Sequence, residues 1–299
     1  MKGASNARVR IGHALSVACW AALLALVFER SAFAQAAGAS APTSSRGSSA
    51  SLWHDDWPEF STTEGILTVT AAVGTGVIVL VGPAEHPRWT GGILFDNAVR
   101  DEIRGRSAET RSRFRTVGNY TYHLSPLIPI FDVLVVSAIG HGDRKLTENL
   151  GALTLEAYSY TGLAAFVSTE ISARARPDAG CQRSDCTADT QSFFSGHAAI
   201  SATGAGLVCA NHTRMALYGS SWADAAICAL SAANALATAT TRVVADRHYA
   251  SDVIVGTGVG FGIGYAVPVL LHYARSGKQL AIGPDPTCGG TCIGVSGAF

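Results

Sequence analysis

Six long apolar stretches follow one another along this chain and limit the folds that are open to it. They span 65–82, 124–140, 149–168, 197–211, 223–240 and 251–274. Most are rich in Ala, Gly, Ser and Thr, which let helices pack closely, and no alternating pattern long enough for a sheet accompanies them. The sequence therefore predicts an all-α bundle of about six apolar helices.

The length of these stretches raises the question of a membrane. Several have the roughly 17–25 residues that a membrane-spanning helix needs, although the fourth is marginal. Charged residues make up only 15% of the 299 residues, against about 25% in typical soluble domains. Two placements stay open: a membrane-embedded protein, and a soluble periplasmic protein whose apolar helices form its core. The formal net charge of zero gives no electrostatic reason to expect nucleic acid as a partner.

The first 34 residues have the pattern of an export signal. Three basic residues precede an apolar run over 11–28, and Ala32-Phe33-Ala34 then supplies the small residues that signal peptidase requires. This pattern predicts a signal peptide over 1–34, and an uncleaved anchor helix is the alternative. Both interpretations place the chain in the cell envelope.

The rest of the chain divides into three parts by composition. Residues 35–60 begin with a run of small and polar residues, which predicts a flexible linker. The apolar stretches lie in a helical domain at 61–275, and residues 276–299 form a C-terminal tail. Acidic residues inside the apolar stretches, such as Asp132 and Glu156, are expected to face the bundle interior and to find partners there.

Cysteine usage agrees with export. Two close pairs flank short polar loops and predict disulfides in an oxidising compartment. These pairs are Cys181 with Cys186 and Cys288 with Cys292. A metal site is the alternative, but neither pair has a histidine or a second cysteine pair at zinc-like spacing. Cys209 and Cys228 lie in apolar stretches and are interpreted as small buried side chains.

Side chains able to carry chemistry gather in three segments at the ends of apolar stretches. The segments are "ARARP" with Arg174 and Arg176, "SGH" at 195–197, and "TRVVADRHYASD" at 241–252. In the third segment His248 and Asp252 stand four residues apart, so on a helix they would share a face. A carboxylate on one imidazole nitrogen fixes the tautomer and makes the other nitrogen more basic. Taken singly, the segments also fit a helix cap, a basic loop and a surface ion pair.

The three segments would meet if successive helices alternate in direction. The stretches 149–168 and 223–240 would then end on the same face, and 197–211 and 251–274 would begin there. That face would hold two histidines, a carboxylate, several arginines and two helix N-termini. Arginine forks and free helix N–H groups are the groups that bind a tetrahedral oxyanion such as phosphate.

These segments resemble the signature of the type 2 phosphatidic acid phosphatase superfamily, which includes bacterial acid phosphatases and vanadium haloperoxidases. That signature is a Lys, six residues and Arg-Pro; then Pro-Ser-Gly-His; then Ser-Arg, five residues, His, three residues and Asp. The matching positions are Arg176-Pro177, Ser195-Gly196-His197, and Arg242, His248 and Asp252 at full spacing. The resemblance covers roughly residues 60 to 275 and implies a helical bundle with its active site at one end.

Three positions depart from the signature. Thr169 stands where the family has its lysine, which removes one phosphate-binding cation, although Arg174 or Arg183 could supply charge nearby. Phe194 replaces the proline, and Thr241 replaces the serine before the arginine. The last two changes are mild, whereas the first bears directly on activity.

The resemblance implies covalent catalysis that requires no metal or other cofactor. His248, oriented by Asp252, would attack phosphorus, and His197 would protonate the leaving alcohol and then help water to hydrolyse the phosphohistidine. The expected phosphate-binding residues are Arg176, Ser195, Gly196, Arg242 and the residue at the lysine position, Thr169.

The expected function is therefore that of a metal-independent phosphatase acting on a lipid phosphate, an isoprenoid diphosphate or a soluble monoester. Its partners would be such a phosphorylated substrate and a membrane, with no nucleic acid. In a membrane-embedded protein the site would face the periplasm. Two alternatives remain: a catalytically weak envelope protein of the same fold, because of Thr169, and a vanadium-dependent haloperoxidase.

Overall fold

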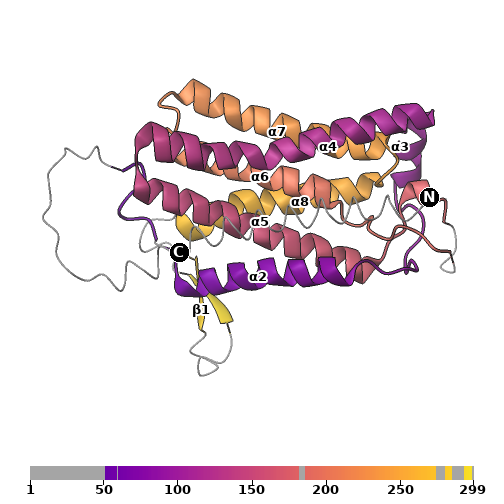
Figure 1. The fold of residues 1–299 in the computed structure, drawn as a ribbon, viewed down its shortest axis with the longest axis horizontal. Helices are drawn as coiled ribbons and strands as arrows, with labels where there is room; N and C mark the ends of the chain where they lie inside the picture. Colours follow the sequence, from indigo (N-terminus) through magenta and orange to yellow (C-terminus); the bar gives the residue numbers. More distant parts are fainter. Residues whose placement is uncertain (1–50, 59, 182–185, 274–279, 285–292, 298–299) are drawn as a thin grey trace, which may run out of the picture. The chain divides into compact units, whose positions relative to one another are not determined.

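All six apolar stretches form helices in the computed structural model of the chain (Figure 1). The structure describes the chain except residues 1–50, 59, 182–185, 274–279, 285–292 and 298–299. The expected signal peptide and most of the expected linker lie outside the described residues. From Leu52 onward the chain forms one packed unit.

The helices are joined by connections at both ends of the bundle, and the longest connection lies between α5 and α6. In order they are α2 (Thr62–Val81), α3 (Asp96–Ile103), α4 (Ala108–Phe131) continued by the π-helix η1 (Asp132–His141), α5 (Arg144–Ser172), the 3₁₀ turn η2 (Pro177–Ala179), α6 (Gly196–Arg214), α7 (Ser221–Val244), and α8 (Ala250–Val267) continued by the π-helix η3 (Pro268–His272). The all-α fold class is confirmed. One difference is that α4 joins the second apolar stretch and the end of the charged segment before it, residues 95–115, in a single helix.

Polar side chains fix where several helices begin. The hydroxyl of Ser61 accepts from the backbone N–H of Glu64, whose carboxylate accepts from the N–H of Ser61 in return. Ser107 and Asp143 cap α4 and α5 in the same way, each accepting a backbone N–H three residues further on. Such caps satisfy N–H groups that have no partner inside the helix.

A short hairpin follows the bundle. Strand β1 (Leu280–Pro284) pairs antiparallel with β2 (Ile293–Gly297), and Leu280 lies opposite Gly297. The expectation that the chain has no sheet is therefore wrong for its C-terminal tail. Each strand has five residues, which is too short for a period of two to stand out in the sequence.

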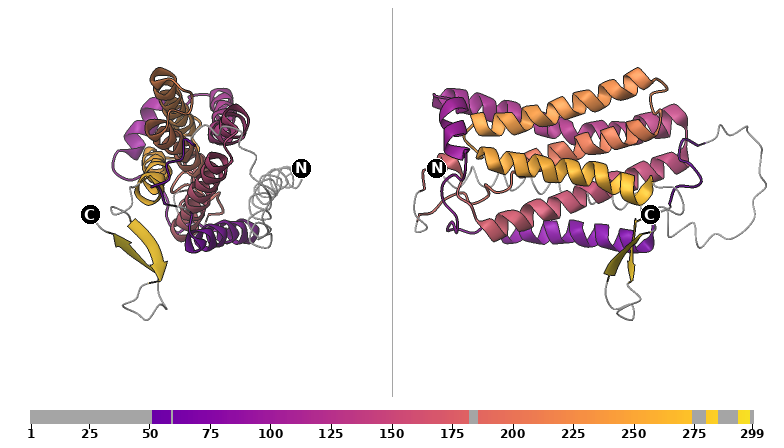
Figure 2. Two further views of the ribbon diagram at one scale, coloured as in Figure 1. Left: turned by 90° about the vertical axis from the view of Figure 1, so that its left-hand side faces the viewer. Right: turned by 180° about the vertical axis from the view of Figure 1, so that it is seen from behind.

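Helix α6 occupies the centre of the bundle. It packs against α4, α5, α7 and α8 (Figure 2), and buried residues follow one another along nearly its whole length. Its approach to α8 depends on glycine, because a Cβ on Gly260 would collide with the backbone of Ala199. Small residues that let two backbones approach are typical of helix pairs in membranes.

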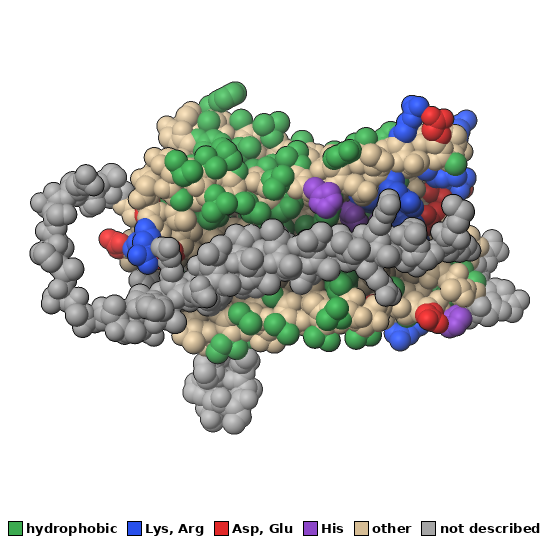
Figure 3. Space-filling model, viewed as in Figure 1, with side chains coloured by type: hydrophobic (Ala, Val, Ile, Leu, Met, Phe, Trp, Pro, Cys, Tyr) green, Lys and Arg blue, Asp and Glu red, His purple; other side chains and the backbone are tan. Residues whose placement is uncertain are grey.

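The outer helices expose apolar side chains. Four segments, Thr62–Val81, Ala108–His141, Ser221–Val244 and Ala250–His272, are long and apolar enough to cross a membrane. Leu80 is 88% exposed, Ile139 76% and Trp222 79%. In Figure 3 apolar side chains spread over the middle of the visible face, and the charged ones gather toward the two ends. A surface of this kind suits a lipid bilayer and favours the membrane-embedded placement over a soluble one.

Ionisable side chains inside the bundle are paired, as the sequence predicted. Asp132 Oδ2 lies 3.2 Å from Nε2 of His212, near the C-terminal end of α6. Glu156 Oε2 lies 3.0 Å from Nε2 of His272. Both pairs are buried, so their hydrogen bonds offset part of the cost of removing charges from water.

Candidate active site

The three polar segments meet at the end of the bundle where α5 and α7 end and α6 and α8 begin. The backbone N–H of Ser192 donates to the carbonyl of Arg174 at 3.1 Å, and that of Ser195 donates to the carbonyl of Asp252 at 3.0 Å. The loop before α6 is thus tied both to the end of α5 and to the start of α8. The alternation of helix direction accounts for this meeting of distant segments.

His248 lies in the turn between α7 and α8. Its side chain is buried, and its Nδ1 is 2.8 Å from the carbonyl oxygen of Ser192. A carbonyl can only accept, so Nδ1 carries the proton and Nε2 carries the lone pair. Nε2 is buried and has no hydrogen-bond partner among the described residues. The ring therefore has an unprotonated nitrogen available for a bound ligand.

Asp252 does not hydrogen-bond directly to His248, contrary to the expectation from their spacing. His248 Nδ1 and Asp252 Oδ2 are 3.9 Å apart. Because α8 begins only at Ala250, His248 precedes the helix and the geometry of residues four apart on a helix does not apply. Asp252 Oδ2 instead accepts from the hydroxyl of Ser192 at 2.6 Å and from the backbone N–H of Tyr249 at 2.8 Å. Ser192 thus connects the two residues, since its carbonyl holds the imidazole.

Arg174 is not a spare cation for phosphate, contrary to one expectation from the sequence. Its buried guanidinium lies 2.5 Å from Asp252 Oδ1 and 2.8 Å from Asp96 Oδ2. The ring centroids of Trp89 and Tyr249 lie 4.0 and 4.1 Å from its Cζ. Two carboxylates and two aromatic rings already engage this charge. The other proposed substitute, Arg183, lies outside the described residues.

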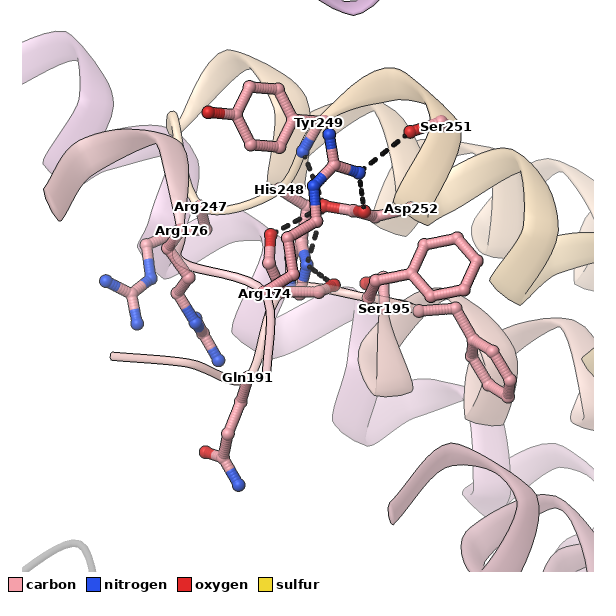
Figure 4. A network of polar contacts seen from close by, with 12 residues as sticks. Arg174, Arg176, Gln191, Ser195, Arg247, His248, Tyr249, Ser251 and Asp252 are labelled. Carbon is pink, nitrogen blue, oxygen red and sulfur yellow. Dashed lines mark hydrogen bonds and ion pairs between the residues drawn. The ribbon is translucent and has the colours of Figure 1, made fainter. Parts of the chain in front are cut away.

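Two other arginines share a pair of aspartates. Asp189 bridges Arg176 Nε at 3.0 Å and Arg247 at 2.8 Å, and Arg247 also pairs with Asp178 at 2.6 Å. In Figure 4 the side chains of Arg176 and Arg247 extend to the same side, whereas Arg174 turns toward Asp252. Burial, together with the neighbouring charge of Arg247, lowers the pKa of Arg176 to about 10. Such crowding of cations favours an anion between them.

Helix α4 adds residues that the sequence interpretation missed. Asn119 Oδ1 accepts from the guanidinium of Arg242 at 2.7 Å, and the Nε of Arg242 is buried with no partner in the described part of the chain. Arg115 lies 3.5 Å from Asp178. The ring of Tyr122 packs on His197 with centroids 4.5 Å apart.

These three α4 residues are spaced by four and three positions, so they lie on one face of the helix. Arg115 ends the charged segment 95–115, whose composition alone indicates surface helices, and the other two residues follow it. The spacing was visible in the sequence. Nothing in the sequence, however, indicated that this face turns toward the three polar segments.

His197 stands at the start of α6. Ser195 is the N-cap, and its hydroxyl accepts from the backbone N–H of Ala198 at 3.4 Å, so Gly196 opens the first turn. Burial and then the charges of Arg242 and other arginines lower the pKa of His197 well below its usual value. A helix N-terminus with this many cations around it suits a bound anion.

Thr169 supplies no charge where the signature has a lysine. It is buried near the end of α5, and its hydroxyl donates to the carbonyl of Phe166 at 2.8 Å. That hydroxyl proton is therefore used inside the helix. Arg247 and Arg115 are the additional cations that the structure brings to the group formed by Arg176 and Arg242.

The structure forms two disulfides in the part of the chain that it describes. Cys181 is bonded to Cys186 in the loop between the first two polar segments. Cys209 on α6 is bonded to Cys228 on α7, so the interpretation of these two as separate small side chains is wrong. Their Cα atoms are 4.6 Å apart because α6 and α7 pack together there. Cys288 and Cys292 lie outside the described residues.

Comparison with known proteins finds similarity over the helices on which the three polar segments lie. Residues 150–276, from α5 to the end of the bundle, match the PAP2 superfamily. A comparison with curated proteins found no match. A solved structure that is similar is that of a transmembrane PAP2 type phosphatidylglycerolphosphate phosphatase from Bacillus subtilis, 18% identical, covering 70% of this chain and 96% of that one with a TM-score of 0.45. As the three motifs predicted, the region of the chain that carries them matches the PAP2 superfamily.

Proposed function

We propose that this protein is a phosphatase that hydrolyses phosphate esters through a phosphohistidine formed on His248. The observation that carries the proposal is the buried Nε2 of His248, which bears a lone pair and has no partner among the described residues. It belongs to a group of residues that includes Arg176, Arg242 and Arg247. A nucleophilic nitrogen beside several guanidinium groups is suited to attack on phosphorus.

The first half of the reaction transfers the phosphoryl group. Nε2 of His248 forms a bond to phosphorus while the bond from phosphorus to the ester oxygen breaks. His197 donates a proton to the leaving oxygen, which departs as an alcohol. Because the arginines lower the pKa of His197, it needs the negative charge of the bound phosphate to hold that proton.

The second half releases phosphate. His197, now neutral, takes a proton from water as the water oxygen attacks phosphorus and the bond from phosphorus to Nε2 breaks. His248 returns to its starting tautomer with the proton still on Nδ1, and inorganic phosphate leaves. The ring is held throughout by the carbonyl of Ser192.

The arginines would stabilise charge on the phosphate oxygens. Arg176 and Arg242 take the positions implied by the motif, together with Ser195 and the backbone N–H of Gly196 at the start of α6. We add Arg247, which replaces the charge that Thr169 lacks. Asp189 pairs with both Arg176 and Arg247, and the two arginines would leave it to bind the phosphate oxygens.

The surroundings of the site support a lipid phosphate as substrate. The site lies at a charged end of the bundle, next to the apolar band formed by the outer helices (Figure 3). A phosphorylated head group would then lie among the arginines while its acyl or isoprenoid chain stays in the bilayer. We propose that this end faces the periplasm, and the disulfide between Cys181 and Cys186 beside the site supports an oxidising compartment.

Hydrolysis by purified full-length protein in detergent tests the proposal. Phosphate release is measured from phosphatidic acid, an isoprenoid diphosphate and p-nitrophenyl phosphate, with His248→Ala as the control. Activity on any of these that is lost in His248→Ala is the expected result. No hydrolysis by folded wild-type protein would favour a catalytically weak envelope protein. Bromide oxidation in the presence of vanadate and peroxide would instead favour a haloperoxidase.

A further inference from the structure

A buried chain of charges lies behind His248, on the side away from the proposed phosphate. Arg174 stands at its centre, and its guanidinium pairs with the carboxylates of Asp96 and Asp252. All three side chains are fully buried. Arg174 also donates to Ser251 at 3.0 Å and to the carbonyl of Gly91 at 2.8 Å. No family motif contains Asp96, which comes from α3, outside the segment that matches the family.

Asp96 is held rigidly in this chain. Its carboxylate accepts from the backbone N–H of Ile93 at 2.9 Å and from the N–H and hydroxyl of Ser251, each at 2.8 Å. Burial opposes ionisation, but these bonds and the one from Arg174 outweigh it and lower the pKa of Asp96 below its usual value. Asp96 is therefore a carboxylate in the folded protein.

The charges in this chain do not cancel. Two carboxylates surround one guanidinium, so the group formed by Asp96, Arg174 and Asp252 carries one net negative charge. Asp252 is the member that faces the imidazole, with its Oδ2 3.9 Å from His248 Nδ1. The groups that oppose a positive charge on the imidazole come from other elements: Arg176 after α5, His197 on α6 and Arg242 on α7.

We propose that Asp96 is a positioning residue that neutralises Arg174 and so leaves the negative charge of Asp252 available to His248. Attack through Nε2 leaves the imidazole with substituents on both nitrogens and a positive charge. A negative charge behind the ring stabilises that cation and the transition states on either side of it. Without Asp96, the charge of Arg174 would cancel that of Asp252. This role rests on the proposed phosphohistidine function.

Two variants distinguish this electrostatic role of Asp96 from a purely structural one. Asp96→Asn removes one negative charge and leaves the group neutral. Asp96→Asn combined with Arg174→Gln removes one charge of each sign and restores the single negative charge on Asp252. Glu102→Gln, which removes a negative charge from an exposed position on the same helix, is the matched control. Folding of each variant is checked by thermal unfolding in detergent.

The kinetic readouts are kcat, KM and the acidic limb of kcat/KM on a substrate that the wild type hydrolyses. We expect Asp96→Asn to lower kcat by at least about tenfold with KM changed by less than about threefold, because Asp96 is not among the residues proposed to bind phosphate. The acidic limb should move to lower pH, since His248 loses the negative charge that favours its protonated form. The double variant should recover part of the lost kcat, and Glu102→Gln should match the wild type.

Several results would overturn the proposal. One is a wild-type kcat in Asp96→Asn; another is a folded double variant that is no faster than the single variant, which would make Asp96 only a structural anchor. If Asp96→Asn does not fold, the double variant is compared directly with the wild type. A kcat within about tenfold of the wild type supports the proposal there, and any larger loss contradicts it. Failure of the wild type to hydrolyse any substrate would instead remove the proposed function itself.

Discussion

His248 is positioned by the backbone carbonyl of Ser192, 2.8 Å from its Nδ1, and not by a direct bond to Asp252. Asp252 acts on the ring through Ser192, because the Ser192 hydroxyl donates to its carboxylate at 2.6 Å. Ser192 therefore holds the imidazole with its backbone and the carboxylate with its side chain. This relationship explains why a residue outside all three motifs matters to the site.

Removing the Ser192 hydroxyl should slow the reaction without removing the nucleophile. Ser192→Ala keeps the carbonyl that accepts from His248 but loses the bond to Asp252, and we expect kcat to fall by about tenfold. Thr190 lies in the same loop as Ser192, and its hydroxyl donates to the carbonyl of Ala84. Thr190→Val removes this hydroxyl and should leave kcat unchanged. Steady-state kinetics of the two variants checks this, and equal rates would show that the Ser192 hydroxyl has no part in catalysis.

The two histidines should respond differently to the leaving group. His248→Ala should abolish turnover of every substrate, whereas His197→Ala should keep a slow rate on p-nitrophenyl phosphate and lose far more on an alkyl phosphate. A good leaving group needs no proton, so it depends less on the general acid. The comparison is the ratio of kcat/KM for the two substrates in each variant. A ratio unchanged by His197→Ala would argue against this division of roles.

Arg247 should contribute to phosphate affinity in place of the absent lysine. Arg247→Gln removes a charge that acts on both Arg176 and His197, and we expect the inhibition constant of inorganic phosphate to rise by about tenfold. Arg113→Gln is the control, because Arg113 pairs with Glu109 on the exposed face of α4. Product-inhibition measurements decide the matter. An unchanged inhibition constant in folded Arg247→Gln would show that Arg247 does not replace the cation that is missing at Thr169.

The close approach of α6 and α8 should be sensitive to a single methyl group. Gly260→Ala places a Cβ against the backbone of Ala199, and we expect it to cost more than about 2 kcal/mol of stability and to disturb the starts of α6 and α8 beside His197 and His248. Gly262→Ala adds the same group where nothing lies within 4 Å, and it should be tolerated. Thermal unfolding in detergent compares the two variants. Equal stability would contradict the packing described for this helix pair.

Both disulfides should be present in protein isolated from the cell envelope. Peptide mapping without reduction is expected to find Cys181 linked to Cys186 and Cys209 linked to Cys228. An exported chain meets oxidising conditions, so thiols placed this close together become oxidised. Free thiols at all four positions would contradict both the pairs and the proposed compartment.

The helices could be predicted because their signals are local. Each apolar stretch is long, and the polar ends at Arg176, His197 and His248 mark where one helix stops and the next begins. Their convergence followed from the alternation of helix direction. The PAP2 match over residues 150–276 covers this same region.

The parts that could not be predicted depend on contacts between distant segments. Asp96 and Asn119 belong to helices whose sequence gives no sign of what they face, yet they bond to Arg174 and Arg242. The prediction of a direct hydrogen bond between His248 and Asp252 was wrong because α8 begins between the two residues. The disulfide between Cys209 and Cys228 could not be predicted for the same reason, since it depends on how α6 and α7 lie against each other.

Trapping the covalent intermediate tests the central claim most directly. Wild-type protein and His197→Ala would be mixed with substrate, quenched in alkali to preserve a phosphohistidine, digested and analysed by mass spectrometry. The account predicts the mass of one phosphoryl group on the peptide that contains His248. With p-nitrophenyl phosphate as the substrate, the amount should be greater in His197→Ala, because this leaving group needs no proton whereas water attack is slowed. Turnover with no phosphoryl group on that peptide, or with the group attached to another residue, would contradict the account.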